Sequence, residues 1–317
     1  MKKLTISVSP HISSPVGTRD LMKDVIKALI PALVAGIYFF RLSAIGIIIS
    51  SVAGCVIAEI IMQKSRKKTI ETGNYSSILT GLLLAMVLPP GLPLWMAFLG
   101  GMFAISLGKE IFGGLGCNVF NPALLARAFL MAAFPVALTT WKQPITLDAV
   151  TTATPLGLAK FEHYSTSFGL LATGNISGCV GETSAIALLI GIAYLLYRKV
   201  IDYRIPAAYV GTVVIFSVIT HMISPGTYLG PVFHVFSGGL ILGAGFMATD
   251  PVTSPVTAKG RWIFGAGCGL ITMTIRLWGG LPEGVMYSIL LMNACTPLIN
   301  QMTRARRYGV EKGGGRK

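Results

Sequence analysis

Long apolar runs, separated by glycines, prolines and short groups of charges, dominate the chain. The stretch from Thr72 to Gly108 holds no charged residue, and Pro89-Pro90-Gly91-Leu92-Pro93 interrupts it. Because helices do not continue through such a cluster, the stretch predicts a helical hairpin. Another uncharged run, from Leu42 to Ala58, ends near several basic residues. Runs of this length are typical of helices that cross a lipid bilayer.

A window close to the thickness of a bilayer predicts about ten transmembrane helices, and thus an all-α polytopic membrane protein. The expected cores are 25–40, 42–62, 78–88, 92–107, 119–138, 183–197, 207–222, 232–248, 263–278 and 285–299. The third, fifth and eighth cores are short or contain Gly or Pro. Since interrupted spans are tolerated where their freed backbone is buried in protein or lines a site, these three are candidates for function.

A weak internal similarity suggests two repeats. Phe-Gly-Gly-Leu-Gly at 112–116 precedes the span with Asn121-Pro122, and Trp-Gly-Gly-Leu-Pro at 278–282 precedes the span with Thr296-Pro297. Five spans in each copy would make the repeats inverted across the membrane, an arrangement known in transporters. Chance recurrence of Gly-Gly-Leu turns at helix ends explains the similarity equally well.

The composition excludes a soluble globular protein. Hydrophobic residues make up 53% of the chain and charged residues 12%, with a mean hydropathy of +0.71, whereas average chains carry about 25% charged residues. The net charge of +14 would suggest nucleic acid as a partner in a soluble protein. Here membrane topology explains the charge better, and no nucleic-acid partner is expected.

The distribution of cations predicts the orientation, because Lys and Arg accumulate on the cytoplasmic side. With both termini in the cytoplasm, 21 of the 26 Lys and Arg residues lie inside. The exceptions are Arg41, Lys142, Lys160 and Arg276 outside and Arg127 in the fifth span. The expected organisation is a cytoplasmic segment 1–24, a transmembrane half 25–138, an outside loop 139–181, a transmembrane half 182–301 and a basic cytoplasmic tail 302–317. A multi-pass protein of the cell membrane, without a cleavable signal peptide, is expected.

Cysteine and histidine spacing indicates no metal site. The five cysteines and four histidines stand singly, without the pairs that zinc or iron–sulfur clusters need. No GxGxxG follows a strand, so no nicotinamide site is expected either.

The outside loop 139–181 is longer than a simple connection requires. It contains Asp148 and a run of threonines that ends in Thr154-Pro155. One interpretation is an ordinary capped turn. The alternative is chemical, because an exposed hydroxyl can accept a phosphate ester and small neighbours give an enzyme access to it.

Four residues of this run resemble a flavin-attachment signature, Asp-x-x-Ser/Thr-x-Ala-Ser/Thr, whose last hydroxyl receives FMN through a phosphoester bond. Asp148, Thr151, Ala153 and Thr154 match it, while Thr152 replaces the usual small residue. The final position, the small preceding Ala153 and the extended conformation favoured before Pro155 favour Thr154 as the acceptor.

The rest of the chain resembles the D-type membrane subunits of Rnf complexes, which are related to the B-type subunits of the sodium-pumping NADH:quinone reductase. The similar segments are Ser9-Pro10-His11, Thr18-Arg19, 116–123 and 247–251. The resemblance implies a flavin-carrying electron-transfer subunit of a complex that couples ferredoxin:NAD electron transfer to sodium or proton translocation. It also implies that other Rnf-type subunits bind ferredoxin and NAD, and that a flavin transferase acts on Thr154. A second, non-covalent flavin such as riboflavin stays open.

Polar residues at membrane depth are further candidates. Arg127 suits a flavin phosphate or an acidic partner, or it snorkels to the interface. Asn118 and Asn121 can bond a flavin or join helices. Asp250 and Glu182 are candidates for an ion path. Because only the loop signature indicates redox chemistry, a solute transporter or channel is the alternative function, and a structural subunit is a third.

Several other polar residues are expected to contact water or the membrane interface. Glu59 and Glu110 lie close enough to the inner face to be solvated, and Glu283 stands in a short outside turn. His221 and His234 are expected at a membrane interface. None of these five is therefore assigned to a site.

Overall fold

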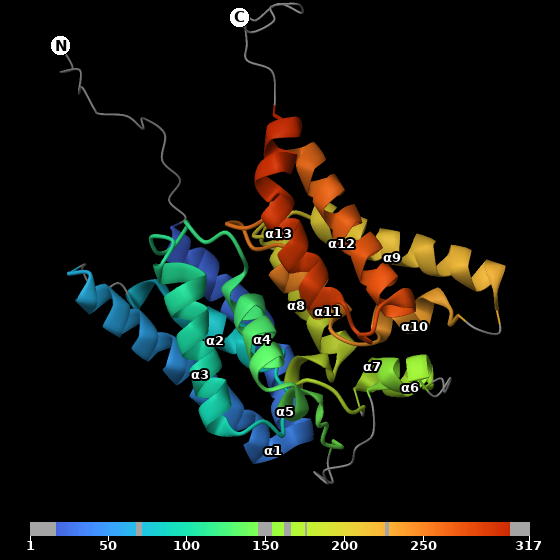
Figure 1. The fold of residues 1–317 in the computed structure, drawn as a ribbon, viewed down its shortest axis with the longest axis horizontal. Helices are drawn as coiled ribbons and strands as arrows, with labels where there is room; N and C mark the ends of the chain where they lie inside the picture. Colours follow the sequence, from blue (N-terminus) through green and yellow to red (C-terminus); the bar gives the residue numbers. More distant parts are fainter. Residues whose placement is uncertain are drawn as a thin grey trace, which may run out of the picture.

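The computed structural model describes residues 17–67, 72–144, 154–161, 166–174, 176–225 and 228–304, and within these ranges the chain is helical with no strand. The helices pack side by side in one bundle (Figure 1). They are α1 (Thr18–Ser65), α2 (Ser76–Met86), α3 (Leu94–Ile105), α4 (Pro122–Ala133), α5 (Pro135–Thr139), α6 (Pro155–Phe161), α7 (Phe168–Thr173), α8 (Ala185–Tyr197), α9 (Arg204–Ile223), α10 (Pro231–Phe236), α11 (Leu240–Leu242), α12 (Ala258–Trp278) and α13 (Val285–Met302). Two π-helical segments, η2 (Ser106–Glu110) and η4 (Gly243–Met247), continue α3 and α11.

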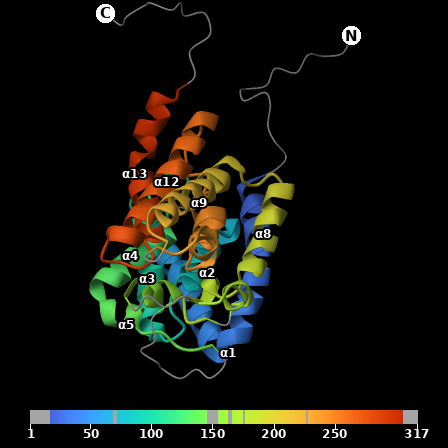
Figure 2. The ribbon, with the colours of Figure 1, turned by 90° about the vertical axis from the view of Figure 1, so that its right-hand side faces the viewer.

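The long helix α1 consists of two helices joined at Arg41. The backbone of Arg41 has φ 50° and ψ −130°, which no helix accommodates. The chain changes direction there, and the second part of α1 returns along α3 (Figures 1 and 2). The break falls between the two apolar cores expected at 25–40 and 42–62, which the sequence separates by this same arginine.

By length and composition, α1 and α9 are able to cross a membrane, and α2, α4 and α8 are shorter apolar helices. The expected cores overlap helices, but two of them are interrupted. Within the expected 119–138 core, α4 ends at Ala133, because Pro135 disfavours the helical conformation of Phe134, the residue before it. The 232–248 core divides into α10 and α11 at Ser237-Gly238-Gly239, where Gly238 has φ +66°.

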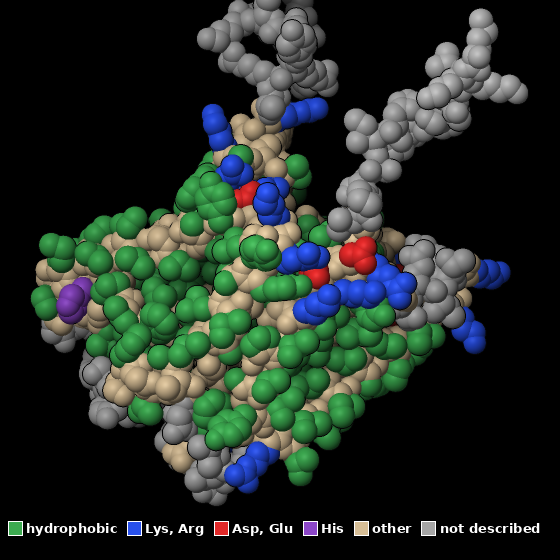
Figure 3. All heavy atoms as spheres, turned by 180° about the vertical axis from the view of Figure 1, so that it is seen from behind, with side chains coloured by type: hydrophobic (Ala, Val, Ile, Leu, Met, Phe, Trp, Pro, Cys, Tyr) green, Lys and Arg blue, Asp and Glu red, His purple; other side chains and the backbone are tan. Residues whose placement is uncertain are grey.

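Apolar side chains cover much of the molecular surface (Figure 3). Tyr38, Leu42, Val136 and Met222 are each more than 70% exposed. A continuous apolar surface of this kind marks contact with a membrane or another protein. In the same view most Lys and Arg side chains gather toward the edge where the described chain begins and ends.

Close helix packing depends on glycines in both halves of the chain. Gly54 of α1 faces the carbonyl of Phe98 in α3 so closely that no side chain fits between them. Gly265 of α12 would place a Cβ 2.7 Å from the carbonyl of Ile205 in α9. Both pairs of helices therefore approach backbone to backbone, as small residues allow in membrane proteins.

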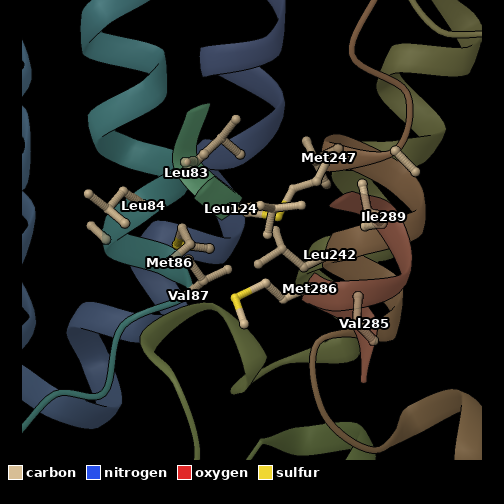
Figure 4. Packing of buried hydrophobic residues seen from close by; sticks show 14 of the residues in the cluster. Leu83, Leu84, Met86, Val87, Leu124, Leu242, Met247, Val285, Met286 and Ile289 are labelled. Atoms are coloured by element: carbon tan, nitrogen blue, oxygen red, sulfur yellow. The ribbon is translucent and has the colours of Figure 1, made fainter. Parts of the chain in front are cut away.

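The two halves meet in an apolar core (Figure 4). Leu83, Met86 and Val87, from α2 and its end, face residues of α11, η4 and α13 across Leu124 of α4. The residues opposite are Leu242, Met247, Val285, Met286 and Ile289. These side chains join the two halves beside the contact of α1 with α8.

The segment between α5 and α8 was expected as a loop, and its described parts contain helices. α6 and α7 lie on the side of the bundle away from the end of α13 (Figure 1). A small apolar cluster holds them there, in which Leu156 of α6 and Leu171 of α7 pack with Phe233 of α10. α6 and α7 therefore form a cap on α10.

Candidate functional site

Thr154 stands at the start of α6 and caps it. Its hydroxyl Oγ1 accepts a hydrogen bond from the Gly157 backbone N–H at 3.2 Å, and its carbonyl accepts one from Leu158 at 2.9 Å. Pro155 occupies the first helical position, where a residue without an N–H is favoured. Thr154 itself is partly exposed. Its side chain is thus held in a defined position at the surface, as an acceptor hydroxyl requires.

Lys160 attaches α6 to the end of α12. Its Nζ donates to the carbonyls of Ile275 at 3.0 Å and Leu281 at 3.1 Å, and also to that of Gly279. These carbonyls close α12 and the turn after it, where helix ends favour a cation. Burial lowers the pKa of the Lys160 ammonium. From the sequence, this lysine was only one of the few outside cations.

The other residues of the flavin signature, Asp148, Thr151 and Ala153, lie outside the described residues. Their roles stay predictions. Thr154 is thus the one member of the signature that the structure locates.

Asn118, Asn121 and Asp250 come together in one pocket on the other side of the bundle, which we call the Asn118 pocket. The start of α1, α2 and the end of α8 also line it. It contains about 910 Å³ of empty space, part of it open to solvent. Its walls are mainly apolar with a few polar groups, as is usual for a small-molecule site.

The amides in this pocket also serve the backbone. Asn121 Oδ1 accepts from the backbone N–H groups of Ala123 and Leu124, so it caps α4, and its Nδ2 donates to the Met247 carbonyl at 3.2 Å. Asn118 donates to the Phe120 carbonyl and interacts with Asp250. Asn121 therefore joins helices, as one of the two predicted roles required. The second hydrogen on its Nδ2 is left to donate to a ligand.

Asp250 closes a turn after η4. Its Oδ1 accepts from the Val252 N–H at 3.4 Å and its Oδ2 from the Thr253 hydroxyl at 3.2 Å. The carboxylate therefore stabilises the turn and faces the pocket at the same time.

Arg127 is paired with an acid inside the molecule. Its Nη2 lies 2.8 Å from Glu283 Oε2, and the side chain is 6% exposed, so it does not snorkel to solvent. The expectation that Glu283 is an ordinary turn residue was wrong. Only the fold brings this residue, which is 156 positions away, to α4.

Glu182 lies next to this pair. It is 8% exposed, and within the described part of the chain its Oε1 has no hydrogen-bond partner. A Cβ built on Gly239 would lie 2.7 Å from Glu283 Oε1 and 3.3 Å from Glu182 Oε1. The two carboxylates thus converge on one glycine, with Arg127 and Arg276 as the nearby cations.

Glu59 and Glu110 were expected to be solvated near the cytoplasmic face, which was also wrong. They are 0% and 2% exposed. Lys109 of η2 binds Glu59 at 2.5 Å and lines the Asn118 pocket. The π-helical turn directs Lys109 inward, toward α1. The positions of charges along the sequence do not predict this direction.

A protein-only metal site is not found among the described residues, which contain no group of three or more His, Cys, Asp or Glu side chains suited to hold one.

Comparison with known proteins gives a consistent family. A family model described as "NQR2, RnfD, RnfE family" matches residues 5–309. The chain is 47% identical over 313 residues to the D-type subunit of the Na(+)-translocating ferredoxin:NAD(+) oxidoreductase complex of Acetobacterium woodii, covering 98% of this chain and 96% of the relative. It is 45% identical over 323 residues to the D-type subunit of the proton-translocating ferredoxin:NAD(+) oxidoreductase complex of Clostridium ljungdahlii, covering 97% of each. The D-type subunit of an ion-translocating oxidoreductase complex of Halorhodospira halophila is 35% identical over 337 residues, covering 95% of this chain and 94% of the relative.

The buried pair predicts a specific pattern of stability. Arg127→Met should destabilise the chain by about 2 kcal/mol, because Glu283, whose side chain is 21% exposed, loses its nearest cation. The double variant Arg127→Met/Glu283→Gln should recover most of this loss, since neither charge remains. Thermal unfolding in detergent, followed by retention on size exclusion, measures the midpoints. Equal midpoints for the single and double variants would show that the pair contributes nothing.

Proposed function

Because the chain belongs to the NQR2, RnfD, RnfE family, we propose that it is a flavin-carrying electron-transfer subunit of a membrane complex. In this complex, electron transfer between ferredoxin and NAD is coupled to the translocation of sodium ions or protons. The names of the relatives support the kind of complex, and they include both a sodium-translocating and a proton-translocating member. The observation that carries the flavin role is the position of Thr154, the last residue of the signature, at a fixed and accessible helix start.

We assign Thr154 as the acceptor of a covalent FMN phosphoester. The bound flavin would supply reversible electron transfer, and the protein would supply its position and environment. The structure fits this role because Thr154 is partly exposed while α6 is attached to α12 through Lys160. Asp148 would be read by a flavin transferase, and the small Ala153 would leave room for the phosphate. Ferredoxin and NAD would bind partner subunits.

The Asn118 pocket fits a second, non-covalent flavin such as riboflavin. An isoalloxazine ring would find apolar walls there, beside the free hydrogen of Asn121 and the amide of Asn118. Arg127 forms its ion pair with Glu283. We therefore do not propose that it also binds the flavin phosphate.

The helices support a ten-span arrangement of two inverted five-helix repeats in the cell membrane. α3 packs against the second part of α1 as α12 packs against α9, and both pairs use glycine at the contact. Yet α3 and α12 run in opposite directions through the bundle (Figure 1). The cations concentrated near the chain ends support cytoplasmic termini and an outside Thr154.

The attachment site is tested by single substitutions. Thr154→Ala should lose all covalent FMN because the acceptor hydroxyl is gone, while Thr151→Ala and Thr152→Ala should keep it. The protein is produced in a host with a flavin transferase, and flavin is detected by in-gel fluorescence and peptide mass spectrometry. FMN that persists in Thr154→Ala would contradict the assignment, and a dark wild-type chain would favour a transporter.

Topology is tested with single cysteines on a Cys117→Ser background, because Cys117 is the exposed native cysteine of the described chain. Phe161→Cys, at a position 64% exposed on α6, should react with an impermeant maleimide added outside. Arg304→Cys, just after α13, should react only after permeabilisation. Reaction of both from one side would contradict the inverted repeats, and the reversed pattern would contradict the orientation.

Asp250 and Glu182 are proposed to lie on the ion path. Glu182 is buried and Asp250 is half-buried in the Asn118 pocket, and both lie at helix interruptions. Asp250→Asn and Glu182→Gln should lower ferredoxin-dependent ion uptake by inverted vesicles several-fold and leave covalent flavin unchanged. Asp20→Asn, at an exposed position near the start of α1, is the matched control. Wild-type ion uptake in either variant would reduce that residue to a structural role.

A further inference from the structure

A second pocket lies directly beside the acceptor helix, and we call it the His234 pocket. It contains about 690 Å³ of empty space, part of it open to solvent. Leu156 and Lys160 of α6 line one side of it. Phe233 and His234 of α10 and Arg276 of α12 line the other.

His234 is an unusual residue in this pocket because its polar atoms are unused. The residue is 5% exposed, and neither Nδ1 nor Nε2 has a hydrogen-bond partner within the described part of the chain. Leaving a buried polar group unpaired costs about 1–3 kcal/mol, so a partner from outside the chain is favoured. The imidazole lies against the ring of Phe233, with centroids 5.7 Å apart and planes at 82°.

The position of the His234 ring is well supported. Arg276 donates from Nη1 to the His234 carbonyl and from Nη2 to the Ser237 carbonyl at 3.0 Å. The end of α10 is therefore fixed to α12. The imidazole is presented to the pocket by rigid backbone rather than by a loop.

The pocket and the acceptor hydroxyl belong to the same short element. Leu156 follows Thr154 by two residues, which limits the separation of their Cα atoms to about 7.6 Å. Leu156 also packs on the break after α10, since a Cβ built on Gly238 would lie 2.7 Å from its Cδ1. Lys160 holds the other end of α6 on α12. A group esterified to Thr154 thus starts within reach of the pocket.

We propose that the His234 pocket receives the isoalloxazine ring of the flavin carried by Thr154, with His234 hydrogen-bonded to the polar edge of the ring. This inference rests on the proposed attachment at Thr154. The ring has an apolar dimethylbenzene side, which suits Leu156 and Phe233, and a polar edge of N–H and carbonyl groups. A neutral imidazole offers one donor and one acceptor to such an edge. Hydrogen bonds to the ring system tune the electronics of a flavin, so His234 is a positioning residue that also affects its reduction potential.

The experiment uses the wild-type chain in its complex and two variants that act on the pocket differently. His234→Leu removes both hydrogen-bonding atoms and should shift the midpoint potential and the visible absorption band of the Thr154-linked flavin. Leu156→Trp fills the pocket and should raise quenching of the flavin fluorescence by iodide several-fold. In both variants the amount of covalent flavin should stay at the wild-type level, because the acceptor is intact.

Phe161→Trp is the control, since Phe161 is exposed on the same helix and does not line the pocket. Should His234→Leu fail to fold, as judged by size exclusion, Leu156→Trp decides alone. Wild-type potential and wild-type iodide accessibility in variants that carry covalent flavin would overturn the pocket assignment. A wild-type chain without flavin at Thr154 would instead overturn the proposed attachment, and this inference with it.

Discussion

The break between α10 and α11 leaves backbone groups without helical hydrogen bonds. The surrounding residues must supply partners for these groups. Backbone groups freed there lie inside the bundle, where lipid or packed protein offers no water to replace a lost hydrogen bond. Arg276 supplies donors to the carbonyls of His234 and Ser237, and Glu283 accepts from the Gly239 N–H at 3.1 Å. Arg127 of α4 in turn neutralises Glu283. A backbone defect in one half is thus stabilised by a charge from the other half.

The same principle explains the opposite side of the bundle. The π-helical segment η4 does not satisfy the Met247 carbonyl within its own helix, and Asn121, which caps α4, donates to it. Polar links therefore join the halves at both ends of an apolar core of Leu, Met, Val and Ile side chains (Figure 4). Because these links occur at broken helices, the same places that need support also leave room for pockets.

The arrangement separates two environments that suit redox groups. The Asn118 pocket is lined by the start of α1, and the His234 pocket is lined by α6, α10 and α12. The start of α1 and α6 lie on opposite sides of the bundle (Figure 1). Between them stand the apolar core and the buried cluster of Arg127, Glu182 and Glu283.

Much of the fold follows from the sequence alone. Apolar runs, separated by Pro and Gly, are sufficient to place the helices and to identify the interrupted ones, because helix propensity and burial act locally. The signature that ends at Thr154 is likewise local, since an enzyme would read it as a peptide. The pattern did not predict that α4 ends before Phe134. It also did not predict the helices α6 and α7, which lie in a segment expected to be a loop.

The partners of the buried charges were decided by tertiary structure. Glu283 and Glu59 resemble residues in contact with water when only their distance from an apolar run is considered, yet one binds Arg127 and the other Lys109. His234 was expected at an interface and is instead enclosed, with both nitrogens unpaired within the described chain. A sequence shows which groups carry charge or hydrogen-bonding atoms. It does not show which distant element will meet them, because that depends on how the helices pack, and packing determines whether a polar group is solvated, paired or left available for a ligand.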